Sequence, residues 1–519
     1  MCLFFRLPEK FAAIKNYFAG HTVMNKNHWF SLLLTAWCAA CTPTQIALTP
    51  SVEIPDAFAE TSAGEAADVS RWWLDWQDDT LTELIEAGRL ANRDLASAKA
   101  NLQAARDEAA LANADLLPTA VINANAGKSH IHADNPLSAG EQAALSSIGL
   151  PVGALHPHGR AQTAGVLVSW EADIFGGKRS DADAAQYAAL AVAEQWHGAQ
   201  ILAVAEIADR YLNIRANERR LAVLQTALKN LQELRRYAAG RFQAGQVSDY
   251  EMKDVGVRIA QLQAALATVQ VQIDAHTRSL AVLTGKTPQD FVLPPSANDI
   301  LNHIPAPPSG VLPVAVLSRR PDVRAVEMQL QARAAQLASA RADLLPRFDV
   351  RFLWQNGRIY LSSDLPHLAA WGGAVSAGVS LPIFTGGRIQ KQIDAADARV
   401  RAALAQYEQS LLNALAEVDN AYQGQFALHQ QNQYLSEAQN QTQQQANGAD
   451  KLFRYGSFTL DKALTARINA ADAADRLIQG RLAQAQQLLL LYKALGGGWL
   501  PENETQASTQ TEAETAAQE

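Results

Sequence analysis

The sequence predicts an α+β membrane protein with an internally duplicated chain, and three observations lead to this fold class. Two short stretches close on a glycine pair, Val168–Gly177 and Val379–Gly387. Each is followed by a run without proline, to Gly245 and to Gly456, and these runs are 68 and 69 residues long. At about 1.5 Å per residue, each run forms a helix on the order of 100 Å long, far longer than an ordinary domain core requires. The third observation is an export signal on a chain without any apolar stretch long enough for a transmembrane helix.

The composition excludes several classes of function. The 519 residues carry a formal net charge of −8, whereas a nucleic-acid surface needs clustered Lys and Arg, so we expect no nucleic-acid partner. The three cysteines, Cys2, Cys38 and Cys41, all lie near the N-terminus, which leaves the rest of the chain without a disulfide framework or a thiol metal site. No phosphate-binding loop, nucleophile elbow or His-Glu-x-x-His pattern occurs, so we expect neither an enzyme nor a cofactor.

The N-terminus has the pattern of a signal peptide, which we assign to residues 1–40. Lys26 supplies a positive charge, Phe30 to Ala40 form an apolar core, and Ala39 and Ala40 are the small residues that a signal peptidase requires. Residues 1–23 fit no part of such a signal, so we expect translation to start at Met24. A long leader that starts at Met1 is the alternative.

The residues at the predicted cleavage site, Ala39-Ala40-Cys41, resemble a bacterial lipobox. We therefore expect Cys41 to be the lipidated first residue of the mature chain, with plain cleavage and no lipid as the alternative. Thr42 follows, instead of the aspartate associated with retention in the inner membrane, so this resemblance implies the outer membrane. Residues 41–70, rich in Pro, Thr and Ala, are interpreted as an extended tether.

Each of the two repeats, residues 71–285 and 313–499, begins with a helix that ends in the same five residues. The first helix is expected from Asp79 to Leu117 and stops at Ala-Asp-Leu-Leu-Pro118, because proline cannot continue the hydrogen-bond ladder. The second stops at Ala-Asp-Leu-Leu-Pro346. The proline-rich residues 286–312 link the repeats, and residues 500–519 are predicted to be a disordered acidic tail.

After each proline the pattern changes to a period of two, which predicts two strands in each repeat. In the first repeat one apolar row is Ala120, Ile122 and Ala124, answered by Val166, Val168 and Trp170. In the second repeat the row is Phe348, Val350, Phe352 and Trp354, answered by Val375, Ala377, Val379, Leu381 and Ile383. Strands of about 9–11 residues with one apolar face suit a membrane β-barrel, and a half-buried soluble hairpin is the alternative. Four strands are too few to close a barrel, so the sequence predicts an oligomer.

The long helices have the seven-residue spacing of a coiled coil. Ile207, Ile214, Leu221 and Leu228 lie on one stripe, with Leu224 and Leu231 beside it. After Gly245 and Gly456 the chain is expected to turn and return as shorter helices, to Leu283 and Leu495. Two shorter helices placed end to end can therefore line each long helix.

Several of these motifs together carry a family resemblance: the duplicated Ala-Asp-Leu-Leu-Pro, the turns Asp173–Gly177 and Pro382–Gly387, and the closing Tyr492–Trp499. They resemble the outer membrane efflux proteins, in particular the lipoprotein branch of the TolC-like family (the OprM and NodT type), over Arg71 to Trp499. The resemblance implies a homotrimer with a twelve-stranded β-barrel in the outer membrane, continued by a twelve-helix α-barrel in the periplasm. It also implies a periplasmic adaptor and an inner-membrane pump of the resistance–nodulation–division (RND) class as partners.

The function that the resemblance implies is a passive duct that carries small molecules, such as drugs and toxic compounds, out of the cell. A type I duct for protein secretion is the alternative within the transporter class, and the lipobox and the Gly-Gly-Gly-Trp499 ending favour small molecules over proteins. A rival from another class is a structural coiled-coil lipoprotein that has no pore.

The helix-return loops contain the candidate site residues. Asp249, Glu251 and Asp254 lie within two turns of the first tip, and rings of such acids in an oligomer could gate a constriction. The alternative is an ordinary helix start, where the helix dipole favours acids. At the second tip Thr465 stands where many relatives have an aspartate, so Asp461 is the candidate acid there. The resemblance makes Gly245 and Gly456 the turns that dock the adaptor.

The remaining motifs receive a structural interpretation. Gly176, Gly177, Gly386 and Gly387 are assigned to strand-to-helix turns, where their backbone freedom explains them without a ligand. Two histidine pairs, His130/His132 and His156/His158, fall in the long loop between the first two strands. Imidazoles are common metal ligands, but exposed loops carry histidines for no special reason, so no metal site is assigned.

Overall fold

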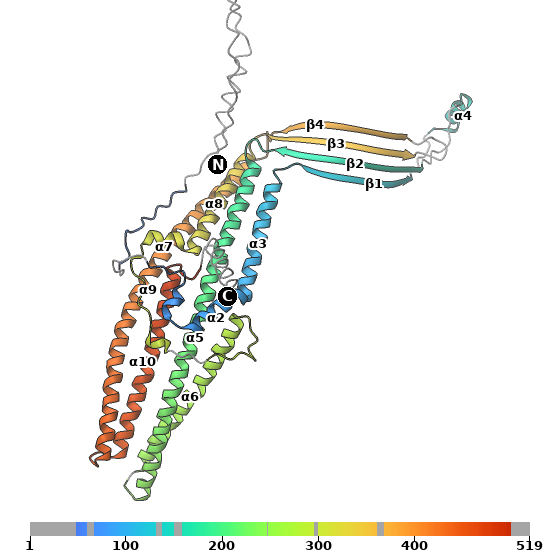
Figure 1. Cartoon of the computed structure of the whole chain (residues 1–519). Helices are drawn as coiled ribbons and strands as arrows, with labels where there is room; N and C mark the ends of the chain where they lie inside the picture. Colours follow the sequence, from blue (N-terminus) through green and yellow to red (C-terminus); the bar gives the residue numbers. More distant parts are fainter. Residues whose placement is uncertain are drawn as a thin grey trace, which may run out of the picture. The chain divides into compact units, whose positions relative to one another are not determined.

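The computed structural model describes residues 48–59, 67–130, 137–149, 158–246, 248–294, 299–360 and 368–499 (Figure 1). The predicted signal peptide, Cys41 and the acidic tail lie outside them. The elements of the first repeat are α2 (Asp79–Ala91), α3 (Arg93–Ala114), β1 (Thr119–His130), α4 (Ala139–Ser147), β2 (His158–Ala172), α5 (Gly177–Gln243) and α6 (Asp249–Leu283). Those of the second are α7 (Pro313–Arg319), α8 (Pro321–Ala342), β3 (Arg347–Tyr360), β4 (Leu368–Ser380), α9 (Arg388–Arg454) and α10 (Leu460–Ala494).

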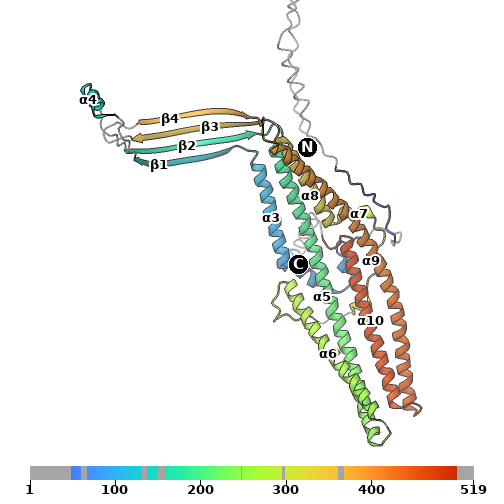
Figure 2. The same cartoon turned by 180° about the vertical axis from the view of Figure 1, so that it is seen from behind.

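The duplication is confirmed in the lengths of the helices. Helices α3 and α8 each have 22 residues, α5 and α9 each have 67, and α6 and α10 each have 35. Both long helices therefore have the length on the order of 100 Å that the proline-free runs predict. The views in Figures 1 and 2 agree that α3 and α6 lie one beyond the other along α5, as two shorter helices lining a long one.

The helix expected from Asp79 to Leu117 is wrong in its extent, because the structure has two helices, α2 and α3, and the second ends at Ala114. Asn92 interrupts them with a ψ of 128°, and its side-chain oxygen accepts hydrogen bonds from the backbone N–H of Asp94 (2.8 Å) and Leu95 (3.1 Å). An asparagine that caps one helix cannot also lie in the interior of a longer one. Helix α3 ends before Pro118 because the residue that precedes a proline avoids the helical conformation.

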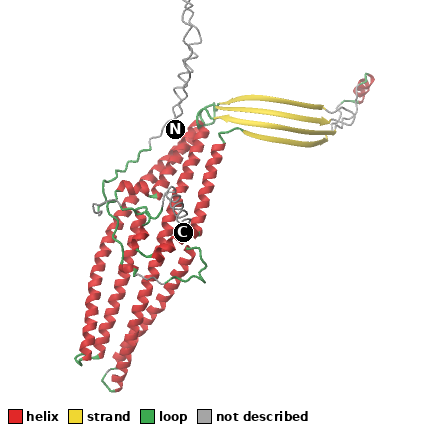
Figure 3. Ribbon diagram, viewed as in Figure 1, coloured by secondary structure: helices red, strands yellow, loops and turns green. Residues whose placement is uncertain are grey.

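The four strands form one antiparallel sheet in the order β1-β2-β3-β4, drawn in yellow in Figure 3. The expected partners are confirmed: Ala120 lies opposite Val168, and Ile122 opposite Val166. The strands have 12, 15, 14 and 13 residues, so the expected length of 9–11 was too short. Leu381 and Ile383 lie beyond the end of β4 and do not extend its apolar row, because Pro382 next to them has no N–H to give to a ladder.

The two faces of the sheet differ in polarity, as alternation along a strand requires. One face carries large apolar side chains that are all exposed: Ile122, Trp170, Val350, Phe352, Trp354, Trp371, Val375 and Val379. The other face carries mostly polar side chains, among them Asn123, Asn125, Ser169, Arg351 and Gln355, with Leu353 in the same row. A contiguous exposed apolar surface of this kind needs a partner or a lipid environment to cover it.

The largest core lies where the middle of α5 meets α10 and the segment that precedes α2. A short 3₁₀ helix, Trp72–Trp76, which the sequence pattern did not indicate, buries Trp72, Trp73 and Trp76 there. Trp72 stacks on Tyr492 of α10 at 4.9 Å between ring centroids. On the expected heptad stripe Ile207 and Ile214 are buried, whereas Leu221 and Leu228 are half-buried. Beside the stripe, Leu231 is buried and Leu224 half-buried.

The closing glycines and tryptophan fasten the end of α10 to this core. The backbone N–H of Gly498 donates to the carbonyl of Val69 (3.2 Å), and the ring of Trp499 stacks on His197 of α5 at 4.3 Å. Gly496 and Gly498 have φ of 69° and 101°, which glycine adopts without strain.

The described part of the predicted tether has no regular secondary structure but is bound to α9. Both the backbone N–H and the hydroxyl of Ser51 donate to Glu408, at 2.8 and 2.7 Å, and the N–H of Ala59 donates to Asp419 at 3.2 Å. Phe58 is buried in the main core. Among the residues that the structure describes, no helix has the length and apolar character needed to cross a membrane.

Candidate functional site

The first candidate feature is the turn that reverses the chain between α5 and α6. Gly245 has a φ of 70°, and the N–H of Gln246 donates to the carbonyl of Arg241 (2.9 Å), which closes the end of α5 in a Schellman-type arrangement. Only glycine adopts this left-handed conformation at no cost. The expected tip at Gly245 is therefore a helix C-cap followed closely by the start of α6.

The three acids expected near this tip are all engaged locally. Ser248 caps α6, and Glu251 completes a capping box by accepting from the N–H and the hydroxyl of Ser248 at 2.8 and 2.9 Å. These hydrogen bonds hold the pKa of Glu251 below its ordinary value. Asp249 pairs with Lys253 at 2.7 Å and Asp254 with Arg258 at 3.0 Å. The geometry thus fits an ordinary helix start, which is compatible with a second role as an acidic ring.

The second tip repeats the first. Gly456 has a φ of 73°, the N–H of Ser457 donates to the carbonyl of Leu452 (2.9 Å), and α10 starts four residues after the glycine, as α6 does after Gly245. Asp461 lies in the first turn of α10 and is exposed. Each tip also exposes a tyrosine, with Tyr250 80% and Tyr455 83% accessible.

The two tips are held together near their ends. A small core of Leu231 and Leu234 from α5, Val255 and Ile259 from α6, and Leu464 from α10 packs between the two hairpins. Glu251 and Asp461, from different repeats, also lie close enough that the charge of Asp461 acts to raise the pKa of Glu251, against the larger effect of Ser248. The fold therefore brings together two of the four acids that the sequence suggested.

Polar links between α5 and α10 were not foreseen from the sequence. Arg467 on α10 contacts Asp450 on α9 at 3.0 Å and Glu233 on α5 at 3.7 Å. Higher up, Arg220 on α5 pairs with Asp475 on α10 at 2.8 Å. The partners are separated by up to 255 residues, and an isolated Arg on an amphipathic helix gives no signal of a partner so far away.

The glycine pairs occupy the strand-to-helix turns to which they were assigned. Gly176 and Gly387 precede the first residues of α5 and α9 and have φ of 77° and 82°. Gly386 has a φ of 60°. Gly177 differs, because its φ is not left-handed and an added Cβ would lie 3.2 Å from the Cβ of Ala342. Close packing of α5 against α8 favours glycine there.

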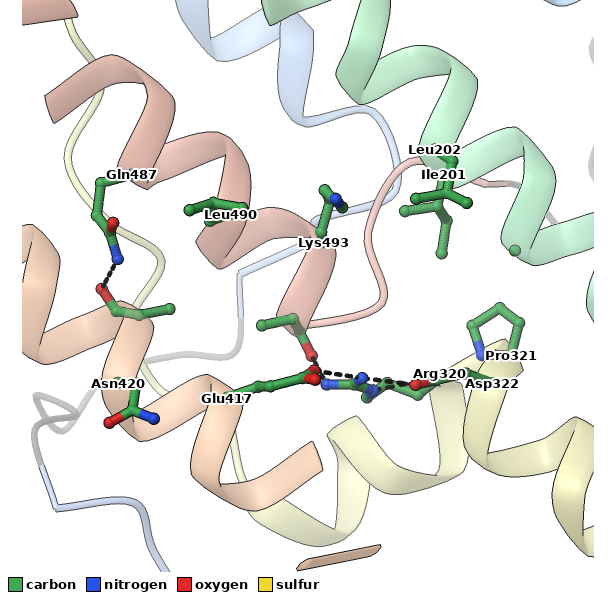
Figure 4. A pocket seen from close by; sticks show the side chains of 13 residues that line it. Ile201, Leu202, Arg320, Pro321, Asp322, Glu417, Asn420, Gln487, Leu490 and Lys493 are labelled. Carbon is green, nitrogen blue, oxygen red and sulfur yellow. Dashed lines mark hydrogen bonds and ion pairs between the residues drawn. The ribbon is translucent and has the colours of Figure 1, made fainter. Parts of the chain in front are cut away.

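A hollow of about 540 Å³ lies where α5, α8, α9 and α10 meet (Figure 4). Its floor is the side chain of Arg320, which is 6% exposed and donates to Asp322 (2.6 Å), Glu417 (2.6 Å) and the carbonyl of Ala494 (3.1 Å). Burial alone would lower the pKa of Arg320, but Asp322 and Glu417 raise it. Since both carboxylates are engaged by the guanidinium, we interpret this cluster as a joint that fastens three helices.

No group of three or more His, Cys, Asp or Glu side chains that could hold a metal occurs in the described ranges. Of the four histidines expected in the loop, His132 and His156 lie outside those ranges. The assignment of His130 and His158 to the loop is wrong, because they are the last residue of β1 and the first of β2 and lie opposite each other in the sheet.

Comparison with known proteins agrees with this geometry. The sequence profile of the outer membrane efflux protein family matches residues 84–286 and 312–497. The chain belongs to this family. It is 28% identical over 480 residues to the pyoverdine export outer membrane protein OpmQ of Pseudomonas putida, covering 92% of this chain and 97% of OpmQ. It is 27% identical to the toluene efflux pump outer membrane protein TtgC of P. putida, covering 88% and 91%.

Solved structures of the family have the same fold. The open state of the Neisseria gonorrhoeae MtrE outer membrane channel superposes with a TM-score of 0.73 at 25% identity, covering 88% of this chain and 98% of MtrE. The outer membrane channel OprN gives 0.72 at 25% identity, covering 89% and 100%. As a member of the outer membrane efflux protein family, the protein is an outer membrane efflux channel, and its long helices belong to the periplasmic tunnel. A structural coiled-coil lipoprotein without a pore is thereby set aside.

Proposed function

We propose that three copies of the chain form a passive duct for small molecules, delivered by an inner-membrane pump of the RND class through a periplasmic adaptor. The observation that carries the proposal is the pair of open sheet edges. Strand β1 pairs only with β2, and β4 only with β3, within the described residues. Edges of 12 and 13 residues with unpaired backbone groups are sites for pairing with another chain.

The helices support the same assembly. Helix α5 packs against α3 and α6 on one side and α8 and α10 on the other, and α9 packs against α8 and α10. The row of helices therefore starts at α3 and α6 and finishes at α9, just as the sheet starts at β1 and finishes at β4. Joining the last element of one copy to the first of the next closes both rows. Three copies supply twelve strands and, at any one level of the tunnel, twelve helices, because α3 and α6, and likewise α8 and α10, follow one another end to end. Closure removes the exposed edges and lets the apolar face of the sheet contact lipid.

The lipid anchor at Cys41 is part of this proposal. Ser51 is bound to Glu408, which lies 20 residues into α9, or roughly 30 Å along the helix from the end of the sheet. Ten residues separate Cys41 from Ser51, and an extended segment of that length reaches at most about 36 Å. The segment is thus long enough for an acyl chain on Cys41 to enter the membrane at the level where the sheet begins.

We place the periplasmic gate at the tips, with Glu251 and Asp461 as its main charges. Asp249 and Asp254 have cationic partners, which reduce their effect on passing ions, whereas Glu251 and Asp461 form no ion pair within the described residues. In a trimer these two acids would give six carboxylates around the opening, which attract cations and repel anions. The turns at Gly245 and Gly456, with the exposed Tyr250 and Tyr455, are the proposed contacts for the adaptor.

Single-channel conductance of the purified protein in planar bilayers tests the duct and the gate. We compare the wild type with Glu251→Gln/Asp461→Asn and with the matched pair Asp249→Asn/Asp254→Asn. The expected result is small cation-selective currents whose selectivity falls in the first variant and changes less in the second. Equal effects of the two variants would remove our choice of gate residues and leave the duct.

The trimer, the anchor and the cargo need separate measurements. Native mass spectrometry of the detergent-extracted protein is expected to give three copies, each with a mass increase for the diacylated Cys41 that Cys41→Ala lacks. A strain that lacks its own outer membrane channels, supplied with this chain and its neighbouring pump, is expected to regain resistance to small toxic compounds. Export of a protein without any gain in resistance would instead favour the type I secretion duct.

A further inference from the structure

The apolar face of the sheet carries three exposed basic side chains near the end that is far from α3 and α5. Toward that end, this face carries the basic residues Lys128 on β1, Arg160 on β2 and Arg358 on β3. Each strand ends two residues farther on, at His130, His158 and Tyr360. All three side chains are exposed. None of them has an ion pair within the described part of the chain.

The strand register places the three cations next to one another. Lys128 lies directly opposite Arg160, and Arg358 is two residues from Tyr360, the other partner of Arg160. Side chains directly opposite on one face have Cβ atoms about 5 Å apart, and diagonal neighbours lie about 7–8 Å apart. Like charges in this arrangement destabilise a sheet. An anion bound between them would offset this repulsion.

The level of the cluster matches one boundary of a membrane. Along β2, ten residues separate Arg160 from Trp170, which is on the same face near the start of α5. With a rise of about 3.4 Å per residue and a tilt of about 40°, this corresponds to roughly 26 Å, close to the apolar band of about 25 Å in outer membrane barrels. Trp170 then lies at the periplasmic boundary, and Arg160 at the outer boundary where lipid headgroups begin.

We propose that Lys128, Arg160 and Arg358 bind the phosphate groups of a phosphorylated lipid in the outer leaflet of the outer membrane. The inference rests on the membrane position of the sheet proposed above. A guanidinium can bind phosphate through two parallel hydrogen bonds, and a lysine adds a point charge. The aliphatic parts of all three side chains lie along apolar surface while the charged ends reach the headgroups.

The opposite face of the sheet argues for a lipid and against a cargo molecule. At the same level the opposite face has Gly127, Ala161 and Ile359 and no cation among the described residues. An anion that passes through the duct would meet this neutral face. Only a molecule outside the barrel contacts the three basic side chains.

Lipid binding by the intact oligomer tests the proposal. The purified protein is placed in phosphatidylcholine nanodiscs, and native mass spectrometry measures binding of lipid A with two phosphates and of lipid A with its phosphates removed. The test variant is Lys128→Gln/Arg160→Gln/Arg358→Gln. The control is Lys229→Gln/Arg235→Gln/Arg236→Gln, which removes the same charge from exposed positions on α5.

The wild type and the control are expected to prefer the phosphorylated lipid, and the test variant to bind it at least about tenfold more weakly. A cation close to an anionic lipid surface contributes about fivefold, and salt screens part of the sum of three. Lys128→Arg/Arg160→Lys/Arg358→Lys is expected to keep most of the binding. Free inorganic phosphate at millimolar concentration is expected not to compete, because it has no acyl chains to enter the apolar band.

Each other outcome overturns a stated part of the argument. Equal binding of the two lipids by a wild type that inserts and conducts would refute the lipid site and leave the duct intact. Competition by free phosphate would show a general anion site instead of a lipid site. Failure of the wild type to insert would overturn the membrane position and with it both proposals. If the triple variant does not assemble, binding of the phosphorylated lipid is compared between Arg160→Gln and Arg235→Gln, and only Arg160→Gln is expected to weaken it.

Discussion

Gly497 lies in a position where a single methyl group is expected to loosen the main core. A Cβ added there would lie 2.5 Å from the carbonyl oxygen of Val69 and 3.2 Å from that of Tyr492. Both neighbours are backbone atoms, and both are fixed: Val69 accepts from Gly498, and Tyr492 accepts from Gly497 itself. The segment before the first repeat must therefore move away from α10 to make room.

The expected cost of Gly497→Ala is about 1–3 kcal/mol, the usual range for overpacking a well-packed core. The matched control is Gly448→Ala in the interior of α9, where an added Cβ meets nothing within 4 Å. Alanine is the better helix former, so the control is expected to gain up to about 1 kcal/mol. The same chemical change thus has opposite signs at the two positions.

The assay is the apparent melting midpoint of the detergent-solubilised oligomer, followed by circular dichroism at one fixed scan rate because unfolding of such proteins is rarely reversible. An unfolding entropy of about 2.1 cal/mol/K per residue, over roughly 450 residues, gives close to 1 kcal/mol per degree. Gly497→Ala should then lower the midpoint by about 1–3 °C and Gly448→Ala raise it by up to about 1 °C. Equal shifts in the two variants, or a higher midpoint for Gly497→Ala, would refute this account of the core.

Three further predictions concern other contacts. Arg467→Ala removes the ion pair between α10 and Glu233 of α5, which is worth about 0.2–1 kcal/mol in each copy of the chain. The variant is expected to have longer open times in single-channel recordings. Unchanged open times would show that this ion pair does not restrain the tip. Burial raises the pKa of Asp322, but the hydrogen bond and charge of Arg320 lower it by more. The pKa of Asp322 is therefore below its ordinary value. The ionised Asp322 side chain thus stabilises the fold at a pH above its ordinary pKa near 3.8, and this stabilisation is lost as the pH falls through the lowered pKa. Between pH 5 and pH 2, the melting midpoint should therefore fall less steeply in Asp322→Asn than in the wild type. Asp78→Ala removes the cap of α2 and also the carboxylate that accepts a hydrogen bond from the hydroxyl of Tyr211 at 2.9 Å. The expected cost is about 2–4 kcal/mol, and Tyr211→Phe should cost less because it keeps the cap. Equal melting midpoints for these two variants would contradict the role given to Asp78.

The structure also shows how far the candidate site could be predicted. The tips at Gly245 and Gly456 were predictable because only glycine takes a left-handed C-cap without strain, so its position marks the end of a helix. The ion pairs of Asp249 and Asp254 follow from i,i+4 spacing, which is also visible in the sequence. The proximity of Glu251 to Asp461 was not predictable, since it depends on how two hairpins from different repeats pack.

The sequence by itself determined the duplicated order of elements, the length of the long helices and the pairing of the strands within each repeat. These features depend on local rules: proline ends a helix, glycine turns the chain, and alternation assigns a strand to one apolar face. The tertiary structure alone decided which helices contact α5, how β2 pairs with β3, and where Arg320, Arg467 and the cations of the sheet find their neighbours. Such contacts join residues that are far apart in the chain. They depend on packing and charge in three dimensions, and the periodicity of residues along one helix or strand does not predict them.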